Sequence, residues 1–459
     1  MSPSRRSLER RLIAFQALDE FMPIFPVYAL LFAENGLSTA EISGLFVLWS
    51  VVTFVLEVPS GAWADTVSRR LLLCLSSVTY GAAFSSWVLF PSATGFAAGF
   101  ALWGLSSALA SGTFQALAYD ELAAIGAQEA RGREHRSEER ARSGLPGERS
   151  QRACSVSSRY ARVIGVGTSA ALVAMALATL LAAPLVALGG YALAGWMSVA
   201  VGAVQFLVAR SLPFTPAVIS VAELDAADEC SDALLETGSA PHNEAGSGVG
   251  RVEAAGFLGR YVLALRVGTG EVLHSRVVRG GVLASALLMG LLAFDEYLGL
   301  MLGEQGATEV AIPLLLVVVT AGQALGGLLA DRVAGWSNAR IGWITAGAGV
   351  CLATGAMSGQ SAGIVAVGVG YGALQLSIVV SDVRLQDSIA AHGVRATVTS
   401  VAGLLAEVVA VVVFAGFARG SLALSLTALV AILAAVVVVL GPAINRWMPP
   451  SGLASSAKQ

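Results

Sequence analysis

The stretch GAWADTVSRR at residues 61–70 follows one long apolar run, and GLLADR at residues 327–332 follows another. Each stretch places a glycine, an aspartate and an arginine in a short segment between two apolar runs. GLS at residues 36–38 and GAT at residues 306–308 precede the same two runs. Because the motif recurs together with its surroundings, the sequence predicts an internal repeat of two similar halves.

The composition predicts that these halves lie in a membrane. Of the 459 residues, 56% are hydrophobic and 13% are charged, whereas a soluble domain carries about 25% charged residues. A transmembrane helix needs about 20 predominantly apolar residues. Runs of this kind predict twelve transmembrane helices, at residues 11–33, 42–64, 71–90, 94–119, 157–183, 185–209, 279–302, 309–330, 341–358, 361–383, 396–418 and 421–444.

The arginines predict the topology. All of them except Arg419 fall at one set of helix ends, and short basic loops stay on the cytoplasmic side. Both chain ends are therefore predicted to be cytoplasmic, in the inner or plasma membrane, and the lack of an Asn-x-Ser/Thr sequon agrees with a bacterial source. The N-terminal arginines do not mark a signal peptide, because Asp19 and Glu20 interrupt an apolar run that continues to Ala33. The net charge of −3 gives no case for nucleic-acid binding.

Hydrophilic stretches divide the chain. Residues 121–156 mix both charge signs with few apolar residues and are predicted to form a disordered loop. Residues 211–277 are predicted to be a cytoplasmic linker with a lateral amphipathic helix, because arginines alternate with apolar residues in its later part. The predicted domains are an N-terminal six-helix bundle at 1–210, the linker at 211–277, a C-terminal six-helix bundle at 278–445 and a tail at 446–459.

GAWADTVSRR resembles the signature Gly-x-x-x-Asp-Arg-x-Gly-Arg-Arg/Lys of the major facilitator superfamily, with Thr66 and Ser68 in place of the usual arginine and glycine. LEVPSG at 56–61 and SGTFQALAYDEL at 111–122 resemble a bacterial branch rich in drug and small-molecule exporters. The resemblance implies an all-α membrane protein whose twelve helices form two pseudo-symmetric six-helix bundles. It also implies transport by alternating access. The arginine and the Gly-Pro motif of many proton antiporters are absent from the fourth and fifth predicted helices.

The loop signature predicts a conformational switch. Asp65 lies at the inner end of the second predicted helix, where a carboxylate can cap the next helix or accept hydrogen bonds from arginines. The alternative is that these charges only set the topology. The predicted switch residues are Gly61, Asp65, Arg69, Arg70, Asp120, Asp331 and Arg332.

Acidic residues within the predicted helices point to proton or cation binding. An ionisable side chain within a span costs about 2.5–3.5 kcal/mol on insertion scales, so each needs a reason. No Lys, Arg or His lies well within a span to neutralise them. In the fold that the resemblance implies, the first, second, seventh and eleventh helices line the central cavity, and they carry all of the acids that lie well inside a span. These residues are Asp19, Glu20, Glu57, Asp295, Glu296 and Glu407.

Their depths differ along the chain. At 1.5 Å per residue, Asp19 and Glu57 both lie about 12 Å from the inner helix ends and are predicted to approach each other. Adjacent acids on a helix point about 100° apart, so only one of Asp19 and Glu20 is expected to face the cavity. Glu57 precedes Pro59, and its alternative role is a structural hydrogen bond at that break. Asp295 is predicted to lie in the outer vestibule, so it is not treated as the repeat-related partner of Asp19.

The sequence favours export of a small amphipathic or cationic molecule in exchange for protons, by a monomer without cofactor or metal. Gln115, Tyr119 and Gln375 offer amide and aromatic contacts for such a substrate. Proton-coupled uptake, export of a metal cation and a transporter-like receptor that signals through residues 211–277 remain alternatives. An enzyme is not expected, because the spans carry no His pair, Ser/His arrangement or phosphate-binding glycine loop.

Overall fold

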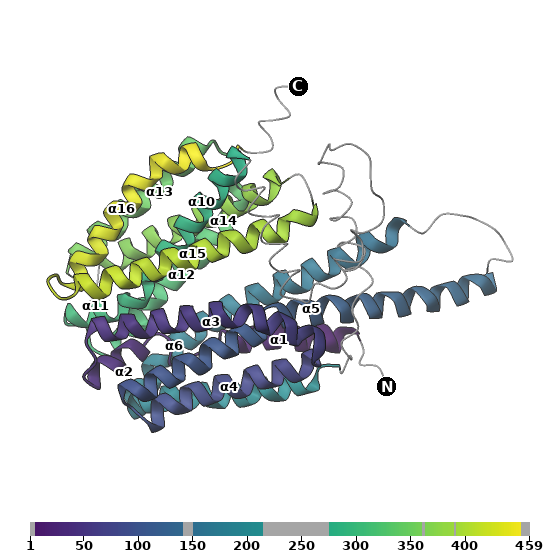
Figure 1. Ribbon diagram of the computed structural model, residues 1–459, viewed down its shortest axis with the longest axis horizontal. Helices are drawn as coiled ribbons and strands as arrows, with labels where there is room; N and C mark the ends of the chain where they lie inside the picture. The colour runs from purple at the N-terminus through teal and green to yellow at the C-terminus, as the bar shows by residue number, and fades with distance from the viewer. Residues whose placement is uncertain (1–4, 141–149, 214–274, 360–362, 390–391, 451–459) are drawn as a thin grey trace, which may run out of the picture. The chain divides into compact units, whose positions relative to one another are not determined.

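The computed structural model describes residues 5–140, 150–213, 275–359, 363–389 and 392–450. Within these ranges, side chains are described except those of Arg5, 57–62, 64–66, Ala123, 126–140, 150–159, Ala161 and 392–397. Every regular element in the described ranges is a helix (Figure 1). The helices are α1 (Arg5–Asp19), α2 (Tyr28–Glu34), α3 (Thr39–Thr66), α4 (Arg69–Leu89), α5 (Ala93–Arg140), α6 (Ser150–Ser211), α10 (Arg276–Leu291), the 3-10 helix η1 (Leu292–Tyr297), α11 (Leu298–Glu304), α12 (Ala311–Val333), α13 (Asn338–Met357), α14 (Gly363–Ser388), α15 (His392–Gly420) and α16 (Leu426–Trp447).

The described part of the chain contains nine helical stretches that are long and apolar enough to cross a membrane. The count of twelve therefore stays a prediction. One predicted helix, residues 11–33, is wrong as a single element, because α1 ends at Asp19 and α2 begins only at Tyr28. Pro23 and Pro26 lie in the gap, where each removes a backbone donor that a continuous helix would use. We call residues 20–27 the break segment.

Helix ends also differ from the prediction in the hydrophilic stretches. The 121–156 stretch was predicted to be disordered, but α5 continues to Arg140 and α6 begins at Ser150. Glu, Gln, Ala and Arg are good helix formers, so polarity alone does not end a helix here. The turn between the fifth and sixth predicted spans lies at Gly190, whose φ of 64° is left-handed, and Pro184 stays inside α6. The predicted lateral helix of the linker lies outside the described residues.

The helices form two compact units. The first comprises Met1–Phe25 with Val52–Val218, and the second comprises Pro26–Val51 with Ile219–Gln459. In the first unit, α4 packs against α5 and α6, and α1 packs against α6. In the second unit, α14 packs between α12 and α13, α16 packs on α13, and α15 packs on α10 (Figure 1). The predicted bundle limits at 1–210 and 278–445 stay a prediction.

The predicted repeat is visible in the backbone of two short helices of the second unit. α2 and α11 each end in a glycine with φ 88°, Gly36 and Gly306. The amide after each glycine bonds to a carbonyl five residues earlier, at 3.1 Å for Leu37 and 2.9 Å for Ala307. This left-handed termination favours glycine, because other residues pay a steric cost there. The recurring GLS and GAT segments therefore encode the same helix ending.

Glycines allow a close contact between α12 and α14 in the second unit. On α12, Gly322 and Gly326 lie against the backbone of Gly368 and Gly372 on α14. A Cβ at either α12 position would overlap a carbonyl oxygen of α14. Small residues at such spacing let two helices approach closely in lipid, where van der Waals packing drives their association. Glycine here is required by packing and not by backbone conformation.

Gly322→Ala should destabilise the protein by about 1–3 kcal/mol, because overpacking forces the two helix backbones apart. Gly327→Ala is the matched control on the same helix, since a Cβ there meets no atom within 4 Å. The control should be neutral or slightly stabilising, because alanine favours helix over glycine. Thermal unfolding of the detergent-solubilised variants measures both effects. Equal midpoints for the two variants would contradict the close contact.

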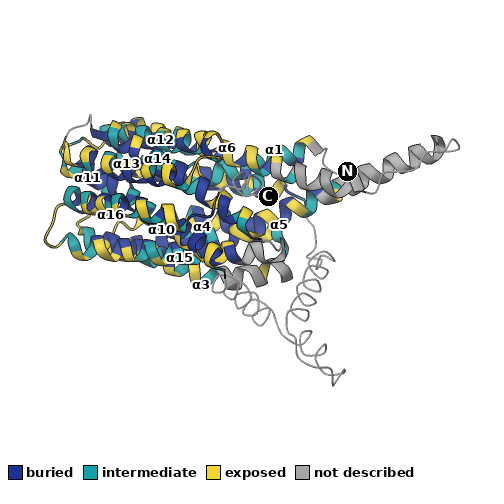
Figure 2. Ribbon diagram, turned by 90° about the horizontal axis from the view of Figure 1, so that it is seen from above, coloured by how far each residue is buried: buried dark blue, intermediate teal, exposed yellow. Residues whose placement is uncertain are grey.

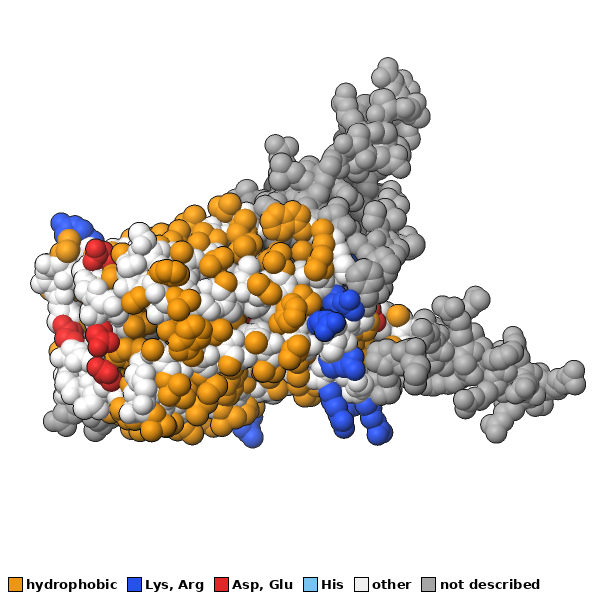
Figure 3. Space-filling model, turned by 90° about the horizontal axis from the view of Figure 1, so that it is seen from below, with side chains coloured by type: hydrophobic (Ala, Val, Ile, Leu, Met, Phe, Trp, Pro, Cys, Tyr) orange, Lys and Arg blue, Asp and Glu red, His pale blue; other side chains and the backbone are white. Residues whose placement is uncertain are grey.

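Hydrophobic side chains cover the outside of the helices. Large apolar residues are strongly exposed, including Leu188 at 82%, Trp343 at 75% and Leu328 at 73%. Exposed positions run along the length of α12 and α15 in Figure 2, and Figure 3 shows hydrophobic side chains across the middle of the face that it draws. A surface of this kind suits a lipid environment, because a soluble monomer rarely exposes large contiguous apolar patches.

Candidate functional site

Both predicted acidic pairs lie where a helix is interrupted. Asp19 is the last residue of α1, and Glu20 is the first residue of the break segment. Asp295 and Glu296 lie in η1, the 3-10 turn between α10 and α11. Interrupted membrane helices are typical of substrate and ion sites in transporters. Both pairs therefore lie at irregular backbone, and the view that Asp19 and Asp295 are not repeat-related partners stays a prediction.

Asp19 lies in a cluster of polar side chains of the first unit. Its Oδ1 accepts a hydrogen bond from Nε2 of Gln205 at 2.8 Å, and Gln205 is fully buried. Tyr80 is also buried, and its hydroxyl lies within electrostatic range of Asp19 and Glu20. In the described part of the chain, neither the Tyr80 hydroxyl nor Oε1 of Gln205 has a hydrogen-bond partner. Buried polar atoms ordinarily have a hydrogen-bond partner. This cluster therefore has one donor, the Tyr80 hydroxyl, and one acceptor, Oε1 of Gln205, that a further polar group could use.

The break segment is held by α6. The backbone N–H of Ile24 donates to Oγ of Ser198 at 3.1 Å, and Ser198 is fully buried. An interrupted helix leaves backbone donors without their usual carbonyls, and in an apolar environment each needs another partner. Ser198 supplies one such partner, so α6 fixes the backbone next to the acidic pair.

Tyrosines surround the acidic pair of the second unit. The hydroxyl of Tyr28 on α2 donates to Oε2 of Glu296. The hydroxyl of Tyr371 on α14 donates to the carbonyl oxygen of Leu292 at 3.5 Å. Both tyrosines are buried, whereas Asp295 and Glu296 are half-buried. The carboxyl group of Glu296 is therefore held by a hydroxyl from α2, and a hydroxyl from α14 bonds to the backbone of the turn that carries Asp295.

Tyr297 anchors the 3-10 turn that carries the pair. Its hydroxyl donates to Oγ of Ser43 on α3 at 2.7 Å. Its ring stacks on Phe417 of α15, with 4.0 Å between the centroids, and meets the ring of Phe46 edge-on at 5.6 Å. Aromatic pairs in these geometries add to the burial energy. The turn is thus positioned by α3 and α15.

Tyr28→Phe should lower the free energy of unfolding by about 1.5–3 kcal/mol, the range for a hydrogen bond to a charged group. The phenylalanine ring keeps the packing of Tyr28 against Phe32 and Phe46. Tyr80→Phe is the matched control, because it removes a buried hydroxyl that has no hydrogen-bond partner in the described ranges. Chemical denaturation of both variants measures the difference. A loss of stability in Tyr80→Phe as large as that in Tyr28→Phe would contradict the assigned hydrogen bond.

One ion pair joins two predicted switch residues. Nη1 of Arg69, at the start of α4, bonds to Oδ2 of Asp120 on α5. The side chains are 12% and 35% exposed, so the pair is partly shielded from water. Arg70 donates from Nη1 to the carbonyl oxygen of Leu212 at 3.4 Å. The two arginines of the sequence signature thus connect α4 to α5 and to the end of α6.

The second unit uses a different arginine at the corresponding loop. Asp331 and Arg332, the predicted switch residues of α12, are exposed, and neither has an ion pair in the described part of the chain. Arg384 on α14 is only 3% exposed. Its Nη2 donates to the carbonyl oxygens of Ala334 at 3.0 Å and Trp336 at 2.6 Å. Arg384 therefore ties α14 to the loop between α12 and α13.

Four other predicted residues lie on α5, α14 and α15. Gln115 and Tyr119 are exposed on α5, and the Tyr119 ring meets that of Tyr160 edge-on at 5.4 Å. Gln375 on α14 and Glu407 on α15 are half-buried. The side chains of Glu57, Gly61 and Asp65 lie outside the described residues, so the predicted approach of Glu57 to Asp19 stays a prediction.

The sequence analysis did not find Gln205, Tyr80, Tyr28, Tyr371 or Arg384. Gln205 is a single polar residue within an apolar run, and that isolation is a signal that sequence reading can use, whereas Arg384 stands among other polar residues in SDVRLQDS at 381–388. The tyrosines carry no comparable signal, because an aromatic residue in an apolar run is ordinarily part of the packing.

No protein-family profile and no curated protein matches the chain. Solved structures do match the chain. The nucleoside transporter NupG matches with a TM-score of 0.63 and 11% identity, over 96% of this chain and 98% of that chain. A POT family transporter in complex with 5-aminolevulinic acid matches with a TM-score of 0.63 and 11% identity, over 96% of each chain. A bacterial homolog of the human lysosomal transporter Spinster matches with a TM-score of 0.60 and 16% identity, over 98% of each chain.

The chain has the major facilitator fold. This result confirms the all-α fold class predicted from residues 61–70 and their recurrence at 327–332. Identities of 11–16% establish the fold alone and not the substrate. In the major facilitator fold, the first and seventh helices are related by the repeat. The two interrupted acidic segments of this chain lie in those two helices.

Proposed function

We propose that this chain is a secondary active transporter that exports a small amphipathic or cationic molecule in exchange for protons. One observation carries the proposal: each repeat-related helix is interrupted at an acidic pair, Asp19–Glu20 in one unit and Asp295–Glu296 in the other. The similar solved structures are transporters, including proteins for nucleosides and a POT family member bound to 5-aminolevulinic acid. That likeness supports transport of a small molecule by a membrane-embedded chain, and we propose that the chain acts as a monomer.

The carboxyl groups are the proposed proton and cation sites. An ionised carboxylate only accepts hydrogen bonds, whereas a protonated one also donates. Gln205 and Tyr28 both donate to the acids that they contact, so each contact favours the ionised form. Proton uptake would add a donor beside Oε1 of Gln205, which has acceptor capacity to spare. Protonation thus changes which neighbouring groups each acid can hydrogen-bond. That change shifts the equilibrium between the conformations of the transport cycle.

The other predicted residues take secondary roles. Gln115, Tyr119, Gln375 and Glu407 are the proposed substrate contacts, because their amide, aromatic and carboxyl groups suit an amphipathic cation. Arg69 and Asp120 are proposed to form a contact that breaks and reforms as the transporter changes state. Gly61, Asp65, Arg70, Asp331 and Arg332 complete the proposed conformational switch.

A reconstituted transport assay tests the function. The full chain in proteoliposomes that contain a pH-sensitive dye is exposed to nucleosides, short peptides and lipophilic cations, one at a time. We expect at least one amphipathic or cationic compound to drive proton movement opposite to its own gradient. Movement in the same direction would establish uptake in place of exchange. Substrate flux that is unaffected by the pH gradient would overturn proton coupling.

A further inference from the structure

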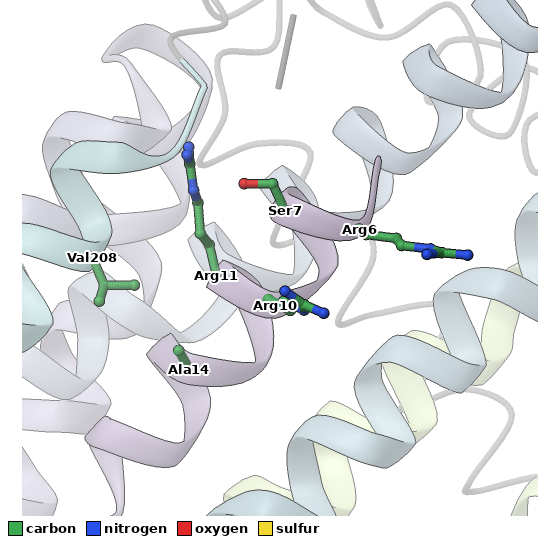
Figure 4. A pocket seen from close by; sticks show the side chains of 6 residues that line it. All are labelled: Arg6, Ser7, Arg10, Arg11, Ala14 and Val208. Atoms are coloured by element: carbon green, nitrogen blue, oxygen red, sulfur yellow. The ribbon is translucent and has the colours of Figure 1, made fainter. Parts of the chain in front are cut away.

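The first unit carries a hollow of about 560 Å³ near the N-terminal end of α1. Figure 4 shows the side chains of Arg6, Arg10 and Arg11, which extend from two turns of α1 around it. The residues that line the hollow are Arg6, Ser7, Arg10, Arg11, Ala14 and Val208, and we call it the arginine pocket. Its volume is in the range of small-molecule sites.

The sequence of α1 explains the pocket. Leu8, Leu12 and Phe15 pack into the hydrophobic core of the unit, so the opposite side of the helix is left for the pocket. Arg6 and Arg10 are four residues apart and share one exposed face. Like charges at this spacing repel each other, so a bound anion would relieve an unfavourable contact.

The charge of the pocket is not cancelled by the protein. In the described ranges, neither Arg6 nor Arg10 is paired with a carboxylate. Glu9 lies on the same stretch of α1, but one glutamate against three arginines leaves the segment positive. Arg11 is already engaged, because its Nη1 donates to the carbonyl oxygen of Ser211 at 2.5 Å. Two guanidinium groups therefore stay available at the mouth of the pocket.

The walls of the pocket are apolar. Ala14 on α1 and Val208 on α6 line it below the arginines. Guanidinium groups bind phosphate through paired hydrogen bonds. Basic pockets between transmembrane helices bind the headgroups of anionic lipids, whose acyl chains continue along the apolar helix surface. A soluble anion would use the arginines but not the apolar wall.

We propose that the arginine pocket binds the phosphate headgroup of an anionic membrane phospholipid such as phosphatidylglycerol. Arg6 and Arg10 hold the phosphate, and Arg11 keeps its bond to Ser211 and supplies the third positive charge. The first acyl-chain carbons lie along Ala14 and Val208. The lipid thereby joins α1 to the end of α6, the helix that also contacts Asp19 through Gln205.

Lipid titration of the full-chain protein tests this proposal. Delipidated protein in an uncharged detergent is titrated with phosphatidylglycerol, phosphatidylcholine or inorganic phosphate, and bound lipid is counted by native mass spectrometry. We expect saturable binding of phosphatidylglycerol that is about thirtyfold weaker in Arg6→Gln/Arg10→Gln. The matched control Arg162→Gln/Arg446→Gln removes two exposed arginines outside the pocket and should bind like the wild type.

A second variant separates lipid from soluble anion. Ala14→Leu fills the apolar wall and keeps every arginine, so it should weaken phosphatidylglycerol binding without a change in fold. Equal binding of phosphatidylcholine would overturn the assignment to an anionic headgroup. Inorganic phosphate that binds as tightly as phosphatidylglycerol would overturn the assignment to lipid. If the arginine variant and its control lost phosphatidylglycerol binding equally, general surface charge and not the arginine pocket would account for the binding.

Discussion

Asp19→Asn combined with Glu20→Gln should reduce pH-gradient-driven substrate accumulation in proteoliposomes to the level of empty liposomes. Neither amide can take up a proton at physiological pH, so the exchange loses its coupling group. Substrate exchange without a pH gradient should persist, because the fold is retained. Asparagine at position 19 has the size of aspartate, and its carbonyl oxygen can still accept the hydrogen bond from Gln205.

The matched control removes two carboxylates outside the helix breaks. Glu34 and Glu309 are exposed near helix ends, and Glu34→Gln/Glu309→Gln should transport like the wild type. Asp295→Asn/Glu296→Gln, tested in parallel, shows whether the second unit carries a coupling group as well. Gradient-driven accumulation by the Asp19/Glu20 variant equal to that of the wild type would refute the assignment of that pair.

The fold could be predicted because local sequence signals suffice for it. GLS and GAT encode the same glycine-terminated helix end at Gly36 and Gly306. The span lengths and the arginine distribution need no knowledge of distant contacts. The break after Asp19 was missed because hydropathy treats residues 11–33 as one apolar run. Pro23 and Pro26 were the signal, since two prolines within four residues oppose a continuous helix.

The acids of the candidate site could be predicted from the sequence, but their hydrogen-bond partners could not. The acids stand out because charge is costly within a span. Their partners are ordinary residues far away in the sequence: Gln205 is 186 residues from Asp19, and Tyr28 is 268 residues from Glu296. The depth of each acid, counted along a straight helix, could not be predicted, because Asp19 is the last residue of α1 and Asp295 lies in a 3-10 turn.

The switch residues show what a sequence repeat can and cannot predict. Asp331 and Arg332 recur after the pattern of the first half, yet the structure leaves both exposed. The buried arginine of the second unit is Arg384, which comes from a different helix. A repeated motif therefore predicted the loop but not the side chain that holds it.

Arg384→Gln should lower the free energy of unfolding by about 3–5 kcal/mol, because it strips the donors from a buried network. The guanidinium bonds to the carbonyl oxygens of Ala334 and Trp336 and to Oδ1 of Asn338 at 2.5 Å. Asn338 in turn donates to the carbonyl oxygen of Met448 at 2.5 Å, beyond the end of α16. The network thus joins α14 to the α12–α13 loop and to the C-terminal end of α16.

Thermal unfolding and size-exclusion profiles of the solubilised variants measure this loss. Arg340→Gln is the matched control, because Arg340 is exposed and only lies over the Trp336 ring at 5.7 Å. Arg384→Lys should fall between the two, since an ammonium keeps the charge but lacks the planar fork that reaches several oxygens at once. If Arg384→Lys were as stable as the wild type, charge alone would account for the role of the residue. If Arg384→Gln matched Arg340→Gln, the α12–α13 loop would be held by other contacts.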